Sequence, residues 1–225
     1  MTKFLASVNN LADAFLVAQA GADIVDLKQP DQGALGALSY DEVLEIVTAL
    51  PSSVQISATV GDLEFIPDVI IPAVFRMLET GVDIVKIGLF PGGDVRASLE
   101  ALSQFTSRNH KLIAVLFADS EIDLNILPEL AAAKFSGVML DTMYKSSGRL
   151  TDLLSHEKLS EFVATAKQLN LLTGLAGSLQ AQDIPALLAL DADYLGFRGA
   201  LCLGFQRTNI IDAKQVSYIR QLIVS

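Results

Sequence analysis

The stretch GADIVDLKQP, from Gly21 to Pro30, has the pattern of a tight turn followed by a buried strand that carries charged residues. GVDIVKIGLF, from Gly81 to Phe90, nearly repeats it, again with a lysine inside the apolar run. KFSGVML and LDADYLG also place a turn directly before an apolar run. A helix that ends near a glycine or aspartate and leads at once into a short strand is typical of a repeated βα unit.

Eight strands are predicted, and their nearly continuous apolar character is typical of parallel strands buried on both faces. They lie near Lys3–Val8, Asp23–Lys28, Val54–Val60, Asp83–Leu89, Lys111–Phe117, Gly137–Asp141, Leu171–Gly177 and Tyr194–Arg198. A helix is predicted after the first strand. Further helices are predicted over Asp41–Leu50, Ile70–Thr80, Val95–Thr106, Leu124–Lys134, Leu159–Asn170, Ile184–Leu190 and Asp212–Val224.

The spacing of these units predicts a closed barrel. Eight units in 225 residues average about 28 residues each, the spacing of a compact (β/α)8 TIM barrel. No linker or change of composition divides the chain, so residues 1–225 are predicted to form a single TIM-barrel domain. A doubly wound sheet is the structural alternative, but the even spacing favours closure.

The composition restricts the classes of function. Hydrophobic residues make up 51% of the chain, and no apolar run reaches the ~18 residues that span a bilayer. The N-terminal segment resembles a leader, but polar residues from Asn9 to Asp13 interrupt it, which predicts a strand and a helix instead. The single cysteine, Cys202, is typical of a reducing cytoplasm. A net charge of −10 without a basic run argues against nucleic acid. We therefore expect a cytoplasmic protein without a membrane or nucleic-acid partner.

The charged residues of the two repeated strands are predicted to meet inside the barrel. Side chains alternate along a strand, so Asp26 and Lys28 share one face and Val25 and Leu27 the other. Val25 and Leu27 suit the outer helix layer, which places Asp26 and Lys28 inside. Interior layers of such barrels come from alternate strands. Asp26 and Lys86 are therefore predicted to lie within ion-pair distance, with Lys28 one layer higher at the mouth.

A salt bridge that only fills the barrel is the structural alternative. Two lysines with one carboxylate, however, leave a cation unpaired in a poorly solvated place, at a cost on the order of several kcal/mol. A lysine beside another cation and away from water loses its proton more readily and becomes a nucleophile or a base. The pattern therefore favours amine chemistry.

Further polar groups are predicted at the same end of the barrel, where TIM-barrel enzymes keep their sites. They are Asp141 at the end of the sixth strand and Lys145 in the loop after it, Gly177 and Ser178 at the tip of the seventh strand, and Arg198 and Gly199 at the end of the eighth. Loops after the last two strands often bind phosphate through backbone N–H groups, and an arginine adds a forked donor. Singly, each residue also has a structural explanation, such as a helix cap or a tight turn.

No metal site and no cofactor site is predicted. His110 and His156 are the only histidines, and neither falls at a strand end. The phosphate-loop and dinucleotide-binding glycine patterns are absent. Cys202 has no histidine partner in view and is interpreted as a packing residue.

Six motifs, in order along the chain, resemble the (5-formylfuran-3-yl)methyl phosphate synthases, also called 4-(hydroxymethyl)-2-furancarboxaldehyde phosphate synthases. The motifs are DIVDLKQPDQGALGA, ISATVGD, DIVKIGLF, VMLDTMYK, LAGSL and GFRGALC. The resemblance implies a TIM-barrel lyase without a cofactor. Such an enzyme condenses two glyceraldehyde 3-phosphate molecules, with loss of phosphate and water, into the furan precursor of methanofuran-type cofactors.

The resemblance also implies roles for individual residues. Lys28 corresponds to the family's Schiff-base lysine and Lys86 to its proton-transferring lysine. Asp26 matches the aspartate that precedes the first lysine, and Asp141 and Lys145 match the LDT-x-x-K pair. The segment CLGFQRTN departs from the lysine and paired glycines found at this position in archaeal members. Phosphate binding there is therefore expected to depend on Arg198, Gly177 and Arg207.

Two other functions stay open at the level of sequence. Asp26, Lys28 and Asp31 also fit the D-x-K-x-x-D pattern of orotidine phosphate decarboxylase-like barrels, in which the lysine donates a proton and no imine forms. A barrel that binds phosphorylated metabolites without turnover is the third reading. The oligomeric state is open as well, because the apolar stretch VIIPAVF suits packing against another subunit or against the barrel itself.

Overall fold

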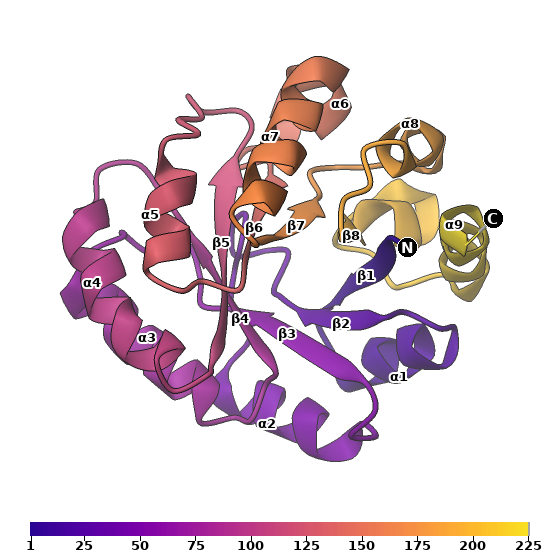
Figure 1. The fold of residues 1–225 in the computed structure, drawn as a ribbon. Helices are drawn as coiled ribbons and strands as arrows, with labels where there is room; N and C mark the ends of the chain where they lie inside the picture. The colour runs from indigo at the N-terminus through magenta and orange to yellow at the C-terminus, as the bar shows by residue number, and fades with distance from the viewer. Residues whose placement is uncertain (225) are drawn as a thin grey trace.

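A computed structural model describes residues 1–224 of the chain, with the side chain of Lys145 excepted. Eight parallel strands form a closed barrel in sequence order, and β8 pairs with β1 (Figure 1). The strands are β1 Lys3–Val8, β2 Ile24–Leu27, β3 Gln55–Thr59, β4 Ile84–Gly88, β5 Lys111–Phe117, β6 Gly137–Asp141, β7 Leu172–Leu175 and β8 Tyr194–Phe197. The predicted TIM-barrel fold is thus confirmed.

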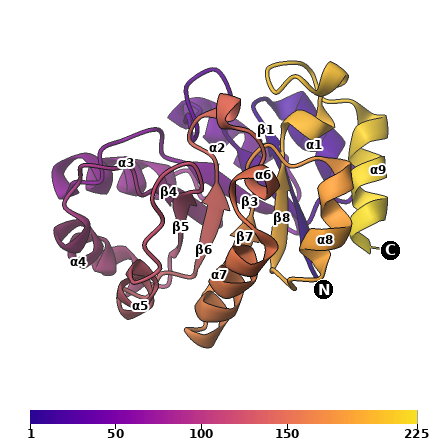
Figure 2. The same cartoon turned by 90° about the horizontal axis from the view of Figure 1, so that it is seen from above.

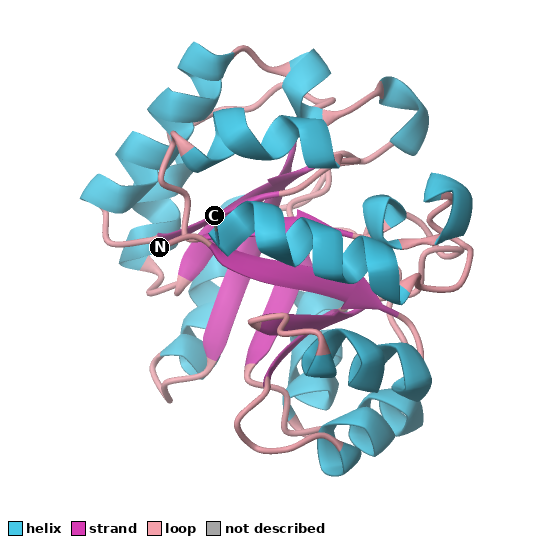
Figure 3. Cartoon of the chain, turned by 90° about the vertical axis from the view of Figure 1, so that its right-hand side faces the viewer, coloured by secondary structure: helices cyan, strands magenta, loops and turns pink. Residues whose placement is uncertain are grey.

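Helices surround the strands, and the two ends of the described chain lie close together (Figures 2 and 3). The helices are α1 Leu11–Gln19, α2 Tyr40–Ala49, α3 Pro67–Leu78, α4 Val95–Thr106, α5 Ile126–Ala132, α6 Leu150–Leu153, α7 His156–Gln168, α8 Ile184–Leu188 and α9 Ala213–Val224. Short 3₁₀ turns are η1 Lys145–Ser147, η2 Ala181–Asp183, η3 Gly199–Leu201 and η4 Leu203–Phe205. The sequence did not predict α6, because four residues are too few to show a helical period.

The apolar stretch in α3 packs mainly against the barrel. Its residues Ile70 and Val74 are fully buried, whereas Phe75 on the outer side of the helix is 51% exposed. Packing within the chain therefore explains most of this stretch.

The repeated turn-and-aspartate pattern closes the amino-terminal end of the barrel. Asp23, just before β2, accepts a hydrogen bond from the backbone N–H of Phe4 in β1, with an N···O distance of 2.8 Å. Asp83, just before β4, accepts one from Ile56 in β3 at 2.7 Å. Asp193, just before β8, accepts one from Thr173 in β7 at 2.7 Å. In the three repeats that carry an aspartate, those before β2, β4 and β8, this residue therefore ties an even-numbered strand to the odd-numbered strand before it.

Replacing Asp83 with alanine is expected to lower the free energy of unfolding by about 1–3 kcal/mol, because the N–H of Ile56 loses its acceptor. Asp83→Asn keeps a side-chain oxygen and should lose less. Urea unfolding of both variants measures the difference. Equal midpoints for both variants and the wild type would show that this contact does not stabilise the barrel.

The strand register explains how Asp26 and Lys86 come together. Asp26 pairs with Ser57 of β3, and Ser57 pairs with Ile84 of β4, so Lys86 lies two residues further along. Because the strands of such a barrel are tilted, a level layer shifts by about one residue per strand. This shift returns Lys86 to the level of Asp26. From base to mouth, the even strands form layers of Ile24, Ile84, Gly137 and Tyr194; Asp26, Lys86, Met139 and Gly196; and Lys28, Gly88, Asp141 and Arg198.

The loop after β2 fills one side of the barrel mouth. Its residues Ala34 and Leu35 are buried among the interior side chains, and the Asp62 carboxylate accepts both of their N–H groups at 2.8 and 2.6 Å. Phe90 and Phe117 pack beside them, with ring centroids 4.6 Å apart. The space that remains open lies toward β6, β7, β8 and β1.

Candidate active site

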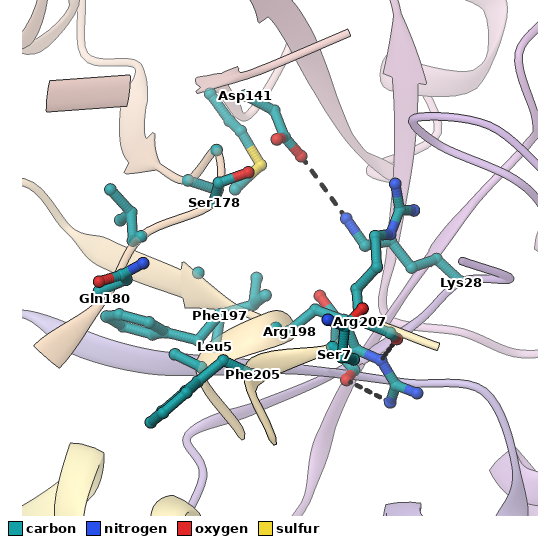
Figure 4. A pocket seen from close by; sticks show the side chains of 18 of the residues that line it. Leu5, Ser7, Lys28, Asp141, Ser178, Gln180, Phe197, Arg198, Phe205 and Arg207 are labelled. Carbon is teal, nitrogen blue, oxygen red and sulfur yellow. Dashed lines mark hydrogen bonds and ion pairs between the residues drawn. The ribbon is translucent and has the colours of Figure 1, made fainter. Parts of the chain in front are cut away.

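A cavity of about 300 Å³ opens at the carboxyl end of the barrel (Figure 4). Its walls come from β1, β4, β6 and β8, from Lys28 after β2, and from the loops after β7 and β8. The predicted residues that line it are Lys28, Lys86, Asp141, Gly177, Ser178, Arg198 and Gly199. Asp26 lies behind Lys86, and the side chain of Lys145 is outside what the structure describes.

The predicted ion pair between Asp26 and Lys86 is confirmed, with a distance of 2.6 Å between Lys86 Nζ and Asp26 Oδ1. Asp26 is fully buried. Its carboxylate also accepts hydrogen bonds from the hydroxyls of Ser7 and Ser57, each at 2.7 Å. Neither serine was predicted from the sequence, although each lies at an inward-facing position of an odd strand, and strand alternation could have shown this.

Burial and charge act in opposite directions on this pair. Burial alone would raise the pKa of Asp26, but the cations of Lys86 and Lys28 and the hydrogen bonds it accepts outweigh burial and lower it. Burial lowers the pKa of Lys86. The attraction of Asp26 raises this pKa but offsets only part of the effect of burial, and the charge of Lys28 lowers the pKa further. Lys86 is therefore a buried amine that releases its proton more readily than an ordinary lysine.

Lys28 lies one layer above this pair, as predicted, and has a partner that the sequence did not predict. Its Nζ is 3.5 Å from Oδ2 of Asp141, which ends β6, and both side chains are almost fully buried. The other oxygen of Asp141 accepts the N–H of Thr142 at 2.7 Å. The sequence suggested one carboxylate for the two lysines, whereas in the structure β6 supplies a second one.

The cavity is positively charged within an acidic protein. Among the described residues that line it, the cations Lys28, Lys86, Arg198 and Arg207 outnumber the single carboxylate of Asp141. Asp26 behind Lys86 leaves the balance positive, although the whole chain carries −10. A local excess of cations in a partly buried cleft favours an anionic ligand.

Arg198 lines the cavity, but its guanidinium is engaged by the protein. It donates to the backbone carbonyls of Arg207 at 2.8 Å and of Ser7 and Asn209 at 3.2 Å each. It also lies 3.8 Å from the carboxylate of Asp13 in α1. These contacts differ from the forked donor to phosphate that the sequence suggested, and they fasten the loop that follows Cys202 to the barrel.

The turn after β7 presents backbone N–H groups at the cavity. Gly177 has φ of +108°, and a side chain there would press on Thr142, so only glycine suits the position. In the described part of the chain, no acceptor is found for the N–H groups of Gly177, Ser178, Leu179, Gly199 and Ala200. All five residues line the cavity. Gly177, Leu179 and Ala200 are buried, and buried N–H groups are rarely left without a partner.

Asp119, which follows β5 at the same rim, was not predicted from the sequence. Its carboxylate accepts the N–H groups of Met143 and Tyr144 at 2.7 Å each. Burial alone would raise the pKa of Asp119, but these hydrogen bonds outweigh burial and lower it. Asp119 therefore holds the loop that leads into Lys145. Its place two residues after a predicted strand was the signal that could have identified it.

Replacing Asp119 with alanine is expected to reduce turnover by roughly 10- to 100-fold, because the loop carrying Lys145 loses its anchor. Stability should fall by about 1–3 kcal/mol at neutral pH. Because the folded pKa of Asp119 is lowered, this contribution is complete above about pH 4 and is lost as the pH falls through that lowered pKa. Steady-state kinetics and urea unfolding of Asp119→Ala and Asp119→Asn test this. An unchanged kcat in the alanine variant would show that the loop keeps its shape unaided.

The histidines and the last residue of the D-x-K-x-x-D pattern lie outside the cavity. Among the described residues, no three His, Cys, Asp or Glu side chains are placed to hold a metal ion, and His110 and His156 are exposed. Asp31, the last residue of the D-x-K-x-x-D pattern, is exposed and absent from the cavity wall. No helix within residues 1–224 combines the length and apolar character needed to cross a membrane.

Comparison with known proteins gives the family. The family model described as 4-HFC-P synthase matches residues 4–220. A Methylorubrum extorquens protein named "Putative (5-formylfuran-3-yl)methyl phosphate synthase" is 40% identical over 96% of this chain and 89% of its own. The (5-formylfuran-3-yl)methyl phosphate synthase of Methanopyrus kandleri is 35% identical over 89% of each chain.

A solved structure supports the fold alone. Phosphoribosyl anthranilate isomerase from Thermotoga maritima superposes with a TM-score of 0.74 at 15% identity, covering 100% of this chain and 99% of that one. The sequence matches, which span nearly the whole barrel and every strand that lines the cavity, show that the chain belongs to the (5-formylfuran-3-yl)methyl phosphate synthase family.

Proposed function

We propose that this protein condenses two molecules of glyceraldehyde 3-phosphate into 4-(hydroxymethyl)-2-furancarboxaldehyde phosphate through a lysine Schiff base. The observation that carries the proposal is that two nearly buried amines, Lys28 and Lys86, line one cationic cavity, each with its own carboxylate. Two triose phosphates have the same atoms as the furan phosphate, one phosphate and two waters. The reaction therefore needs no oxidant or reductant.

Lys28 is the proposed nucleophile. Its amine adds to the carbonyl carbon of one triose phosphate, and loss of water gives an iminium that makes the adjacent C–H acidic. Asp141, 3.5 Å from the Lys28 amine, is placed to exchange the protons that imine formation requires. The near-complete burial of Lys28 keeps bulk water from the imine.

Lys86 is the proposed base. Its lowered pKa makes the neutral amine available nearer to physiological pH, where it can take the proton beside the iminium. Asp26 then stabilises the ammonium that forms, and the two serines hold Asp26 in place. The resulting enamine carbon forms the carbon–carbon bond to the second triose phosphate.

Asp141 and Lys145 are proposed to move protons while water and phosphate leave. Loss of these groups produces an aromatic furan, which makes the overall sequence favourable. Gly177, Ser178, Gly199 and Arg207 are proposed to bind phosphate, with the N–H groups that lack protein acceptors in the described chain among the donors.

Borohydride reduction of the protein with glyceraldehyde 3-phosphate tests the proposal. A stable mass increase on Lys28, together with a furan aldehyde absorbance when borohydride is omitted, is the expected result. Furan formation without a trapped adduct would favour proton-transfer chemistry of the decarboxylase-like type. Binding of the triose without turnover would identify a phosphometabolite-binding barrel, and an adduct on another lysine would overturn the assignment of Lys28.

A further inference from the structure

We propose that the cavity binds the two substrate phosphates in chemically different subsites, with backbone N–H groups for the phosphate that the product retains and Arg207 for the phosphate that leaves. This inference rests on the proposed condensation, because only a reaction that begins with two phosphates and ends with one needs both subsites.

Arg207 reaches across the mouth of the barrel from the loop after β8. Its Nη2 donates to the carbonyl of Gly33, in the loop after β2, at 2.9 Å. Its side chain lines the same cavity wall as Lys28 and Asp141, and the close view shows it rising beside Lys28 (Figure 4). Burial lowers the pKa of Arg207, while attraction by Asp141 opposes that effect. An arginine remains charged in such a place.

Arg207 still has donors to offer. Within the described residues, its guanidinium makes the single hydrogen bond to Gly33, and no acceptor is found for Nε or Nη1. By contrast, the three nitrogens of Arg198 are bonded to backbone carbonyls. The arginine that can take a phosphate is therefore Arg207.

Arg198 is a positioning residue for Arg207. Its Nε donates to the carbonyl of Arg207 itself, and its Nη2 donates to that of Asn209, two residues further on. Its Nη1 donates to Ser7 in β1. These bonds fix the backbone of the loop relative to the barrel wall, so that the side chain of Arg207 extends over the cavity.

The second subsite is neutral. It consists of the N–H groups of Gly177, Ser178, Leu179, Gly199 and Ala200, for which the described chain holds no acceptor. Neutral donors suit a phosphate whose charge stays constant through the reaction. A cation stabilises the transition state more than neutral donors do where negative charge develops, as it does on a leaving group.

Phosphate loss creates such a charge. The proton on the carbon beside the departing group moves to a base, and the C–O bond to the phosphate breaks with its electron pair going to the phosphate oxygen. A C=C bond forms, and neither oxidation nor reduction is involved. Arg207 lines the same cavity as Lys28 and Asp141, so its cation is available to the phosphate oxygen on which this charge develops.

Product inhibition separates the two subsites. In Arg207→Gln, the inhibition constant of inorganic phosphate is expected to rise about 10- to 100-fold, the effect of losing charge-assisted hydrogen bonds. The inhibition constant of the furan phosphate should change less than about threefold, since its phosphate lies on the N–H groups. Arg207→Lys should give an intermediate result. An equal rise for both inhibitors, or no rise for either, would overturn the assignment.

Arg198→Lys tests the positioning role. The variant is expected to weaken inhibition by inorganic phosphate while the furan phosphate inhibits as before. A purely structural role would lower the active fraction without changing either inhibition constant, and this result would contradict positioning.

A binding measurement tests the Arg207 subsite even if the protein does not catalyse the condensation. Should the wild-type protein form no furan from glyceraldehyde 3-phosphate, the proposed function falls. Line broadening of inorganic phosphate in ³¹P NMR then compares wild type with Arg207→Gln directly. Broadening that the variant loses would support an anion site at Arg207, and equal broadening would refute it.

Discussion

Replacing Lys28 with arginine is expected to reduce furan formation by on the order of 10⁴-fold or more, because a guanidinium cannot form the imine. The fold should survive, since arginine keeps a cation opposite Asp141 and the burial of the long side chain. The loss should appear in kcat rather than in substrate binding, as the electrostatic attraction for phosphate is retained. Steady-state kinetics with the furan absorbance as readout measures it.

Borohydride trapping makes the same variant a test of chemical role. The wild-type protein should give the adduct and Lys28→Arg should not. Lys111→Arg is the matched control, because Lys111 is exposed at the first residue of β5, at the opposite end of the strands from the cavity. An adduct that persists in Lys28→Arg and disappears in Lys86→Arg would exchange the roles of the two lysines.

The interior placement of Asp26, Lys28 and Lys86 could be predicted because it depends on local rules. Alternation fixes which residues of a strand face inward, and the near-identical repeat aligns strand two with strand four. The uniform tilt of an eight-stranded barrel then makes that alignment a layer. Nothing beyond short stretches of sequence and the closure of the barrel is needed for this pair.

The partners of Lys28 and Arg198 could not be predicted in the same way. The Lys28–Asp141 pair depends on the layer continuing across four strands, and a single wrong register would separate the two residues. Arg198 was expected to face phosphate because it ends a strand. Its actual contacts depend on the path of a loop that has no periodic pattern, in which Gly204 and Phe205 both adopt positive φ. Loop paths are set by many weak contacts rather than by local propensity.

Asp119 shows a third reason why a site residue can escape prediction from sequence. Sequence patterns mark residues with direct chemistry, such as lysines in apolar strands, more clearly than residues that hold a loop. A carboxylate that accepts two N–H groups resembles any other loop aspartate in sequence, although its effect on the Lys145 loop is direct. The same holds for Ser7 and Ser57, whose role depends on Asp26 lying between them.

Asp26→Asn is expected to lower the free energy of unfolding by about 3–5 kcal/mol near neutral pH, because the Lys86 ammonium becomes an unpaired buried charge. The folded pKa of Lys86 is already below its unfolded value, and losing the attraction of Asp26 lowers it further. Between these two pKa values the unfolded state binds more protons, so stability rises with pH. The destabilisation should therefore shrink toward pH 10, where the unfolded lysine also approaches neutrality. Urea unfolding across this pH range measures the trend.

The double variant Asp26→Asn/Lys86→Met separates charge from packing at this pair. If the unpaired ammonium causes the loss, removing it should return stability toward that of the wild type and abolish the pH dependence. Catalysis should stay absent, since the proposed base is gone. If the loss comes instead from disturbed hydrogen bonds to Ser7 and Ser57, the double variant should be no more stable than Asp26→Asn. That outcome would make Asp26 a packing element of the barrel and would remove the electrostatic basis for Lys86 as the base.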